Sequence, residues 1–117
     1  EAKIVRRGEV WVANLNPVRG REMGKVRPVL VVQGDELLQV GSPTVVVLPL
    51  TTPVQLQLRL LRITLQARDR LQQDCQVVID QPRTVDRRRI GDGPLTRLTP
   101  IELAAVDRGM RVALGLY

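Results

Sequence analysis

At 117 residues the chain has the usual length of one domain, and it can bury a core without the help of a disulfide or a metal. Apolar residues make up 44% of it but aromatic residues only 2%, so Leu, Val and Ile must fill the core. Its 18 basic residues, sixteen of them Arg, outnumber 12 acidic ones. The excess favours a polyanionic partner, because the guanidinium fork suits phosphate, although a GC-rich genome or a solvated basic surface would produce the same balance.

The composition also limits the chemistry. The sequence has no His and one Cys, and no cluster of metal ligands at the usual spacing, which excludes zinc catalysis, a Cys–His nucleophile and a His-based ribonuclease. We therefore expect neither a metal nor another cofactor. Cys75 stands in an apolar run and is expected to be a buried strand thiol in a reducing compartment. No apolar run approaches the ~18 residues that span a bilayer, and no signal-peptide core is present, so we expect a soluble, cytoplasmic protein with no membrane partner.

Short strands dominate the first half of the chain. Residues 8–13 alternate apolar with other residues at the period of a half-buried strand. Residues 18–26 then form a charged, Gly-containing loop. Residues 28–32 and 44–48 are β-branched runs typical of strands buried on both faces, and residues 36–39 between them fit one helical turn.

The second half adds strands and ends in a helix. Residues 58–65 favour a strand with a flexible lead-in, with helix as the alternative. Residues 75–80 predict a further strand, and residues 82–86 are expected to continue it past a bulge. Residues 99–102 combine an N-cap Thr, a Pro and a Glu in a capping box, so a helix begins there, and Gly115 is placed to end it.

The expected architecture follows from this order of elements. The terminal helix carries one apolar stripe that should pack on the strands, formed by Leu103, Val106, Met110, Ala113 and Leu114. Five to seven short strands followed by one helix predict a mainly β fold, a small, twisted and partly closed barrel. We expect residues 1–117 to form one domain.

Two features remain as candidates for chemistry. A Gly-rich charged loop runs directly into Lys25 and Arg27 at the start of a buried strand. A pair of hydroxyl residues, Thr51 and Thr52, follows another buried strand. Taken alone, each has a structural explanation: Arg27 pairs with a carboxylate at a strand start, and Thr51 is a turn residue.

Five ordered blocks of sequence carry a resemblance to a known family. They are residues 7–11 (RGEVW), 20–31 (GREMGKVRPVLV), 49–51 (PLT), 78–86 (VIDQPRTVD) and 95–99 (LTRLT). Over nearly its whole length the chain resembles the MazF/PemK toxins. The resemblance implies a homodimer of SH3-like barrels of the CcdB/PemK type, cleavage of single-stranded mRNA to leave a 2′,3′-cyclic phosphate, and inhibition by a cognate MazE-like antitoxin.

The family's catalytic arginine and threonine fall on Arg27 and Thr51. This fits the chemistry, because RNA cleaved by its own 2′-hydroxyl passes through a doubly charged phosphorane that a guanidinium and a hydroxyl can stabilise. Arg is a poor general base, so the loop carboxylate Glu22 is the candidate for accepting the 2′-hydroxyl proton, with a solvated loop charge as its alternative.

The RNA-binding residues that we predict are basic or carry a hydroxyl. They are Arg19, Arg21, Lys25, Thr52, Arg83 and Thr84. Arg83 would equally serve as a sheet-edge charge against aggregation, and the run at residues 87–89 fits a solvated turn as well as a phosphate contact. Met23 and Arg21 depart from residues common in the family, so sequence specificity does not transfer.

Two other functions remain open. A toxin of the same fold that binds DNA gyrase would not need Arg27 and Thr51. A non-catalytic nucleic-acid-binding barrel would explain the charge and the strands, but not the loop around Glu22.

Overall fold

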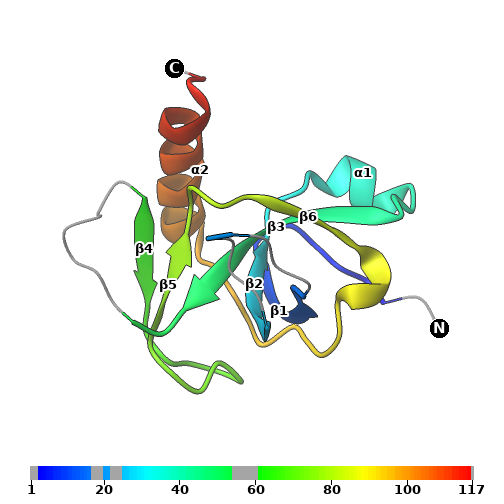
Figure 1. Cartoon of the computed structure of the whole chain (residues 1–117), viewed down its shortest axis with the longest axis horizontal. Coiled ribbons are helices and arrows are strands. Elements are labelled where there is room, and N and C mark those ends of the chain that lie inside the picture. The colour runs from blue at the N-terminus through cyan, green and yellow to red at the C-terminus, as the bar shows by residue number, and fades with distance from the viewer. Residues whose placement is uncertain (1–2, 17–19, 22–24, 54–60, 117) are drawn as a thin grey trace.

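The computed structural model describes residues 3–16, 20–21, 25–53 and 61–116. Its elements in chain order are β1 (Glu9–Asn14), β2 (Val26–Val31), α1 (Asp35–Gln39), β3 (Thr44–Thr51), β4 (Arg62–Leu65), β5 (Cys75–Val78), β6 (Arg83–Asp86), η2 (Arg87–Arg89), β7 (Thr96–Arg97) and α2 (Pro100–Leu114). The predicted mainly β fold with a C-terminal helix is confirmed (Figure 1). No helix in the described ranges is long and apolar enough to cross a membrane.

The strands form one curled antiparallel sheet in the order β4-β5-β3-β2-β1-β7. β3 lies at the centre of the sheet. β2 pairs along one side of β3, and β5 and β6 each pair with part of its other side. β6 pairs with the first half of β3, where Val46 lies opposite Thr84, and β5 pairs with the last two residues, Leu50 and Thr51. The end of β3 therefore lies between β2 and β5, which places Thr51 at a junction of three strands.

Alternate residues of these strands supply two apolar clusters. Leu30, Leu48 and Leu50 belong to one cluster, which α2 covers through Val106. Their neighbours Val29 and Val47 belong to a second cluster, built with Trp11, α1 and the segment around Ile90. The central strands are thus buried on both sides, as their unbroken β-branched sequence predicts.

One prediction for the second half needs correction. Residues 82–86 do not continue the preceding strand, because β5 ends at Val78 in a turn and β6 is a separate strand on the other half of β3. For the described part of the ambiguous segment, β4 confirms a strand rather than a helix. β7, only two residues long, was not anticipated.

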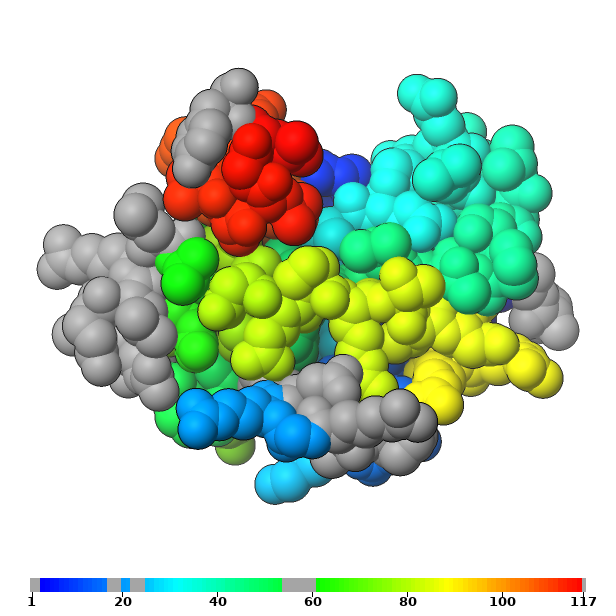
Figure 2. Space-filling view, turned by 45° about the horizontal axis from the view of Figure 1, so that its top comes forward, coloured from blue at the N-terminus to red at the C-terminus, as the bar shows by residue number. Residues whose placement is uncertain are grey.

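The terminal helix begins and ends as predicted. Thr99 Oγ1 accepts a hydrogen bond from the Glu102 amide, the Glu102 carboxylate accepts one from the Thr99 amide, and Gly115 ends α2 with a left-handed φ of 70°. The apolar stripe is only half correct: Val106 is fully buried, whereas Leu114 is 56% exposed. The C-terminal half of α2 extends past the sheet and is exposed on the surface (Figure 2, red).

Candidate active site

The register of the central strands places Arg27 and Thr51 side by side. β2 and β3 are antiparallel, with Val31 opposite Val47 and Val29 opposite Pro49. Continuing this register by two residues sets Arg27 opposite Thr51, so that both side chains project from the same face of the sheet. Arg27 Nη1 also donates a hydrogen bond of 3.2 Å to the carbonyl of Leu50, the residue before Thr51. The two residues that the sequence assigns to catalysis are brought together here.

The surroundings of Arg27 lower the pKa of its guanidinium. The residue is partly buried, and desolvation lowers its pKa from the ordinary value of 12.5. The group remains a cation at neutral pH, since an arginine keeps its proton far above that range. A partly desolvated guanidinium beside a hydroxyl interacts with a phosphate more strongly than one in bulk water, because the local dielectric is lower.

The same row of side chains continues into β5 and β4 through residues that the sequence did not single out. Gln76 lies opposite Thr51 in the β3–β5 pair and opposite Thr64 in the β4–β5 pair. It is 2% exposed, and its Nε2 donates a hydrogen bond of 3.1 Å to Thr64 Oγ1. A polar row therefore runs from Arg27 through Thr51 to Gln76 and Thr64. Nothing in the sequence pattern marked Gln76, because its neighbours form an ordinary apolar strand.

Of the residues predicted to bind RNA, three lie in or beside the connections next to this row. Thr52 is exposed in the bend directly after β3. Lys25 is exposed just before β2, with a left-handed φ of 71°, and its amide donates a hydrogen bond of 3.0 Å to Asn16 Oδ1. Arg21 is exposed in a turn. Arg19 and Glu22 lie outside the described residues.

Arg83 and Thr84 lie further away, at the first half of β3. Arg83 pairs with Val47 and Thr84 with Val46, which lie about 13 and 17 Å along β3 from Thr51 at the usual rise per strand residue. Because neighbouring strand residues point to opposite faces, Arg83 shares the face of Thr51 and Thr84 does not. The structure thus separates two residues that the sequence grouped together.

The basic run over residues 87–89 makes contacts within the protein. Arg87 donates to the carbonyl of Ser42 at 2.9 Å, Arg88 pairs with the carboxylate of Asp86 at 3.0 Å, and Arg89 donates to the carbonyl of Asn16. These contacts agree with the structural explanation of the run as a turn.

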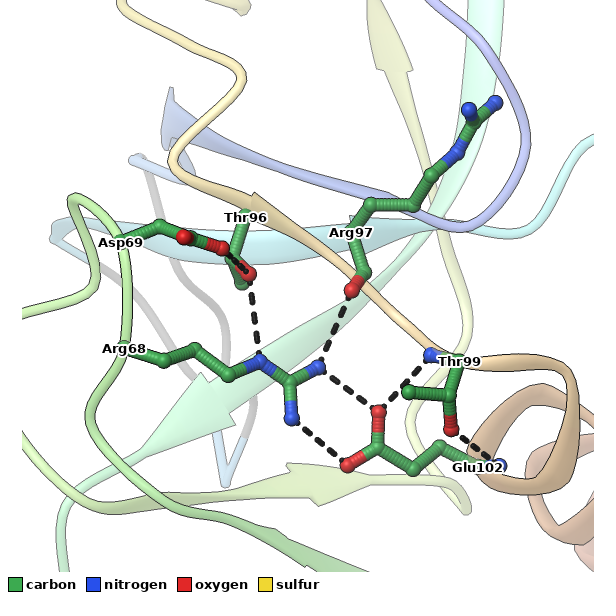
Figure 3. Close-up of polar contacts among 6 residues, drawn as sticks. All are labelled: Arg68, Asp69, Thr96, Arg97, Thr99 and Glu102. Carbon is green, nitrogen blue, oxygen red and sulfur yellow. Dashed lines mark hydrogen bonds and ion pairs between the residues drawn. The ribbon is translucent and has the colours of Figure 1, made fainter.

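A second polar cluster joins the loop between β4 and β5 to the start of α2 (Figure 3). Arg68 holds both oxygens of Glu102, at 2.7 and 2.8 Å, and its Nε donates to Thr96 Oγ1 at 3.2 Å. The Thr96 hydroxyl in turn donates to Asp69 Oδ2 at 2.7 Å. The bond to Glu102 raises the pKa of Arg68, and the same bond lowers the pKa of Glu102. The cluster thereby fixes the loop that carries Asp69 against β7 and the helix cap.

The metal-binding potential of the site is limited by its side chains. Across the parts of the chain that the structure describes, no three His, Cys, Asp or Glu residues lie close enough together to hold a metal ion. Cys75 is buried in β5, and desolvation raises its pKa to about 11, so its thiol is protonated at neutral pH.

Comparisons with known proteins identify similar sequences and similar folds. The chain is 33% identical to the endoribonuclease MazF of Staphylococcus epidermidis over 114 residues, which cover 97% of this chain and 93% of that protein. Its fold is similar to the crystal structure of MazF from Deinococcus radiodurans, with a TM-score of 0.82 at 24% identity and coverage of 97% and 99% of the two chains. It is also similar to the MazE–MazF complex of that organism, with a TM-score of 0.76 at 22% identity and coverage of 99% and 100%.

The family model for PemK-like, MazF-like toxins of type II toxin–antitoxin systems matches residues 6–114, which include every described strand and helix. Since this match spans nearly the whole chain and the Staphylococcus epidermidis relative is an endoribonuclease, the chain belongs to the PemK-like, MazF-like family of type II toxins.

Proposed function

We propose that the chain is an endoribonuclease toxin that cuts single-stranded RNA, mRNA above all, at short sequences and without a metal ion. The observation that carries the proposal is the contact of Arg27 Nη1 with the carbonyl of Leu50, next to Thr51, together with the β2–β3 register, which sets Arg27 opposite Thr51 when it is continued by two residues. The 33% identical relative named as an endoribonuclease supports the reaction class.

In this reaction the 2′-oxygen of one ribose attacks the adjacent phosphorus, and the bond to the 5′-oxygen of the next nucleotide breaks. The products are a 2′,3′-cyclic phosphate and a 5′-hydroxyl end. One proton leaves the 2′-hydroxyl and one is delivered to the departing 5′-oxygen. The protein must supply positive charge for the phosphorane, proton transfer, and an in-line arrangement.

Arg27 supplies the charge in this proposal. Its guanidinium carries donors in a planar fork that matches two phosphoryl oxygens, and its partial burial strengthens the interaction. Thr51 donates its hydroxyl to the same phosphate and orients it. Glu22 accepts the 2′-hydroxyl proton, while Arg19, Arg21, Lys25 and Thr52 contact the flanking phosphates, with Arg83 and Thr84 binding RNA further along.

The proposal extends to the partners. Solved structures of similar fold include an endoribonuclease in complex with its cognate antitoxin from a mycobacterial species, with a TM-score of 0.76. We infer that this chain acts in the cytoplasm as a homodimer and is inhibited by a cognate MazE-like antitoxin.

The test is to incubate the purified protein with a mixed-sequence single-stranded RNA in EDTA and to map both ends of the products. Discrete cuts with 2′,3′-cyclic phosphate and 5′-hydroxyl ends are expected, at a rate that EDTA does not change. Cleavage that stops in EDTA would overturn the metal-free mechanism. Intact RNA with a folded protein would overturn the ribonuclease and favour a gyrase-binding toxin or a non-catalytic RNA-binding barrel.

A further inference from the structure

A pocket of about 620 Å³ opens beside the end of β3, with Thr51 and Thr52 on its wall. Its volume falls in the range of sites that hold small molecules. Of the described residues proposed for catalysis or RNA binding, only Thr51 and Thr52 line it, so most of the lining has no role in the proposed reaction.

The floor of the pocket is apolar. Val12, Pro28, Leu50 and Leu71 contribute to it, and the Cys75 thiol completes it. Pro28 and Leu50 are the strand neighbours of Arg27 and Thr51, so the floor lies on the opposite face of the sheet from the Arg27 side chain. The end of β3 separates the pocket floor from the Arg27 side chain.

The rim of the pocket is polar and comes mainly from the loop between β4 and β5. Gln72 and Gln73 are exposed on it. Arg70 Nη2 and Asp92 Oδ2 form an ion pair of 2.5 Å beside them, with both side chains more than half exposed. The rim therefore offers amide donors and acceptors together with a planar guanidinium–carboxylate pair.

Asp69 is the rim residue whose position is most tightly fixed. It adopts a left-handed φ of 51°, which is uncommon for a residue with a side chain. Its Oδ2 accepts the hydrogen bond from Thr96, and the neighbouring Arg68 is held in turn by Glu102 (Figure 3). The Asp69 carboxylate is thereby held at the rim by contacts that lead to β7 and the start of α2.

We propose that this pocket binds one base of the substrate RNA, a base with an exocyclic amino group, and that Asp69 accepts a hydrogen bond from that amino group. The proposal rests on the proposed ribonuclease function. The nucleotide whose phosphate contacts Arg27 and Thr51 turns its base around the end of β3 into the pocket. A carboxylate accepts from the amino groups of adenine, cytosine and guanine, whereas uracil has none.

The composition of the chain supports a base in this pocket. Proteins that read single-stranded RNA commonly stack bases on aromatic rings. Of the two aromatic residues here, Trp11 is buried in the second cluster and Tyr117 lies outside the described residues. An apolar floor beside the Arg70 guanidinium, a planar cation, provides the contact that a ring would otherwise give.

The test substitutes Asp69→Asn and compares cleavage sites on a randomised single-stranded RNA library. Asn tolerates a left-handed φ, its carbonyl still accepts from Thr96, and its amide now donates into the pocket. We expect the preference for amino-bearing bases at one position of the cleavage motif to fall at least about tenfold and to shift toward uracil, with the other positions unchanged. Gln73→Ala, on the same rim, should relax that position without a shift toward uracil.

The matched control is Glu36→Gln, which removes one carboxylate charge from exposed α1, on the other side of the molecule (Figure 1). It should leave the motif unchanged. An active wild type whose motif is the same in Asp69→Asn and Gln73→Ala would overturn the base pocket and leave the ribonuclease standing. A wild type that leaves every RNA intact would overturn both.

Discussion

Arg27 and Arg68 are both partly buried, but their surroundings shift their pKa values in opposite directions. Arg68 bonds to both oxygens of Glu102, which raises its pKa, whereas desolvation lowers the pKa of Arg27, whose guanidinium donates to the carbonyl of Leu50. The bidentate contact with Glu102 gives Arg68 a role in the stability of the fold. The desolvation of Arg27 supports its proposed role in binding a phosphate.

The largest effect on catalysis is expected from Arg27→Ala. Removing the guanidinium takes away the main stabilisation of the phosphorane and should reduce the cleavage rate by about a thousandfold or more. The midpoint of thermal unfolding should change little, because Arg27 is only partly buried and lies near the start of β2. Single-turnover cleavage of a labelled RNA and a thermal melt measure the two quantities.

The control for Arg27→Ala is Arg97→Ala, which removes the same charge from an exposed position on β7. It should keep cleavage within a few-fold of wild type. Equal losses in the two variants would show that only net charge matters, and the distinction between Arg27 and the other arginines would fail.

Thr51→Ala is expected to have the next largest effect. Loss of a hydroxyl that donates to the transition state should lower the cleavage rate by about a hundredfold, while Thr51→Ser, which keeps the hydroxyl, should retain most of the activity. The rate of cleavage at saturating RNA is the quantity to compare. If the Ser and Ala variants lose activity equally, Thr51 acts through packing and not through its hydroxyl.

Arg68→Ala should reverse the pattern of Arg27→Ala. It leaves Glu102 without its bidentate partner and Thr96 without the Nε donor, so the free energy of unfolding should fall by about 2 kcal/mol. Urea denaturation measures this loss. A stability unchanged from wild type would mean that the network of Figure 3 is a surface feature of little energetic weight.

The pH dependence of stability tests how much the charge of Glu102 stabilises the fold. Its pKa is lowered in the folded protein by Arg68, so the stabilisation is complete above the ordinary value of 4.5 and is lost as the pH falls through the lowered folded value. Glu102→Gln keeps a capping box but removes the charge. The variant should be less stable than wild type by about 1 kcal/mol at neutral pH, and the difference should vanish in acid; a constant difference would contradict the assignment.

The sequence predicted best what depends on neighbouring residues. The capping residues Thr99 and Glu102 are only three positions apart, so the pattern alone located the start of α2. The β-branched runs located β2 and β3 for the same reason, because burial on both faces is visible in consecutive residues.

The pairing of Arg27 with Thr51 was predicted in a different way. It came from a family resemblance, and only the register of β2 and β3 gives it a geometric basis. The catalytic roles of both residues stay predictions.

Contacts between distant segments could not be predicted. Arg68 and Glu102 are 34 positions apart, and Asp69 becomes a pocket residue only because Thr96 meets it across the fold. Gln76 is buried beside Thr51 through strand pairing that no local pattern encodes. The same limit explains the exposed end of α2, since the apolar stripe is longer than the sheet it covers.

The smallest effect is expected at Arg88, whose ion pair with Asp86 lies at the surface, with 90% of the Arg88 side chain exposed. The Arg88 guanidinium holds the pKa of Asp86 at about 2, so Arg88→Ala should raise that pKa toward its ordinary value of 3.8. The Asp86 carboxylate also accepts from the backbone amide of residue 88, a bond that the substitution leaves in place, so the rise should be incomplete. The carboxyl pKa can be followed by NMR titration.

The melting temperature should stay the same, because solvent screens the charges of an exposed pair. A clear loss of stability in Arg88→Ala would therefore undermine the contrast with Arg68, since burial of the pair would no longer decide its energetic weight.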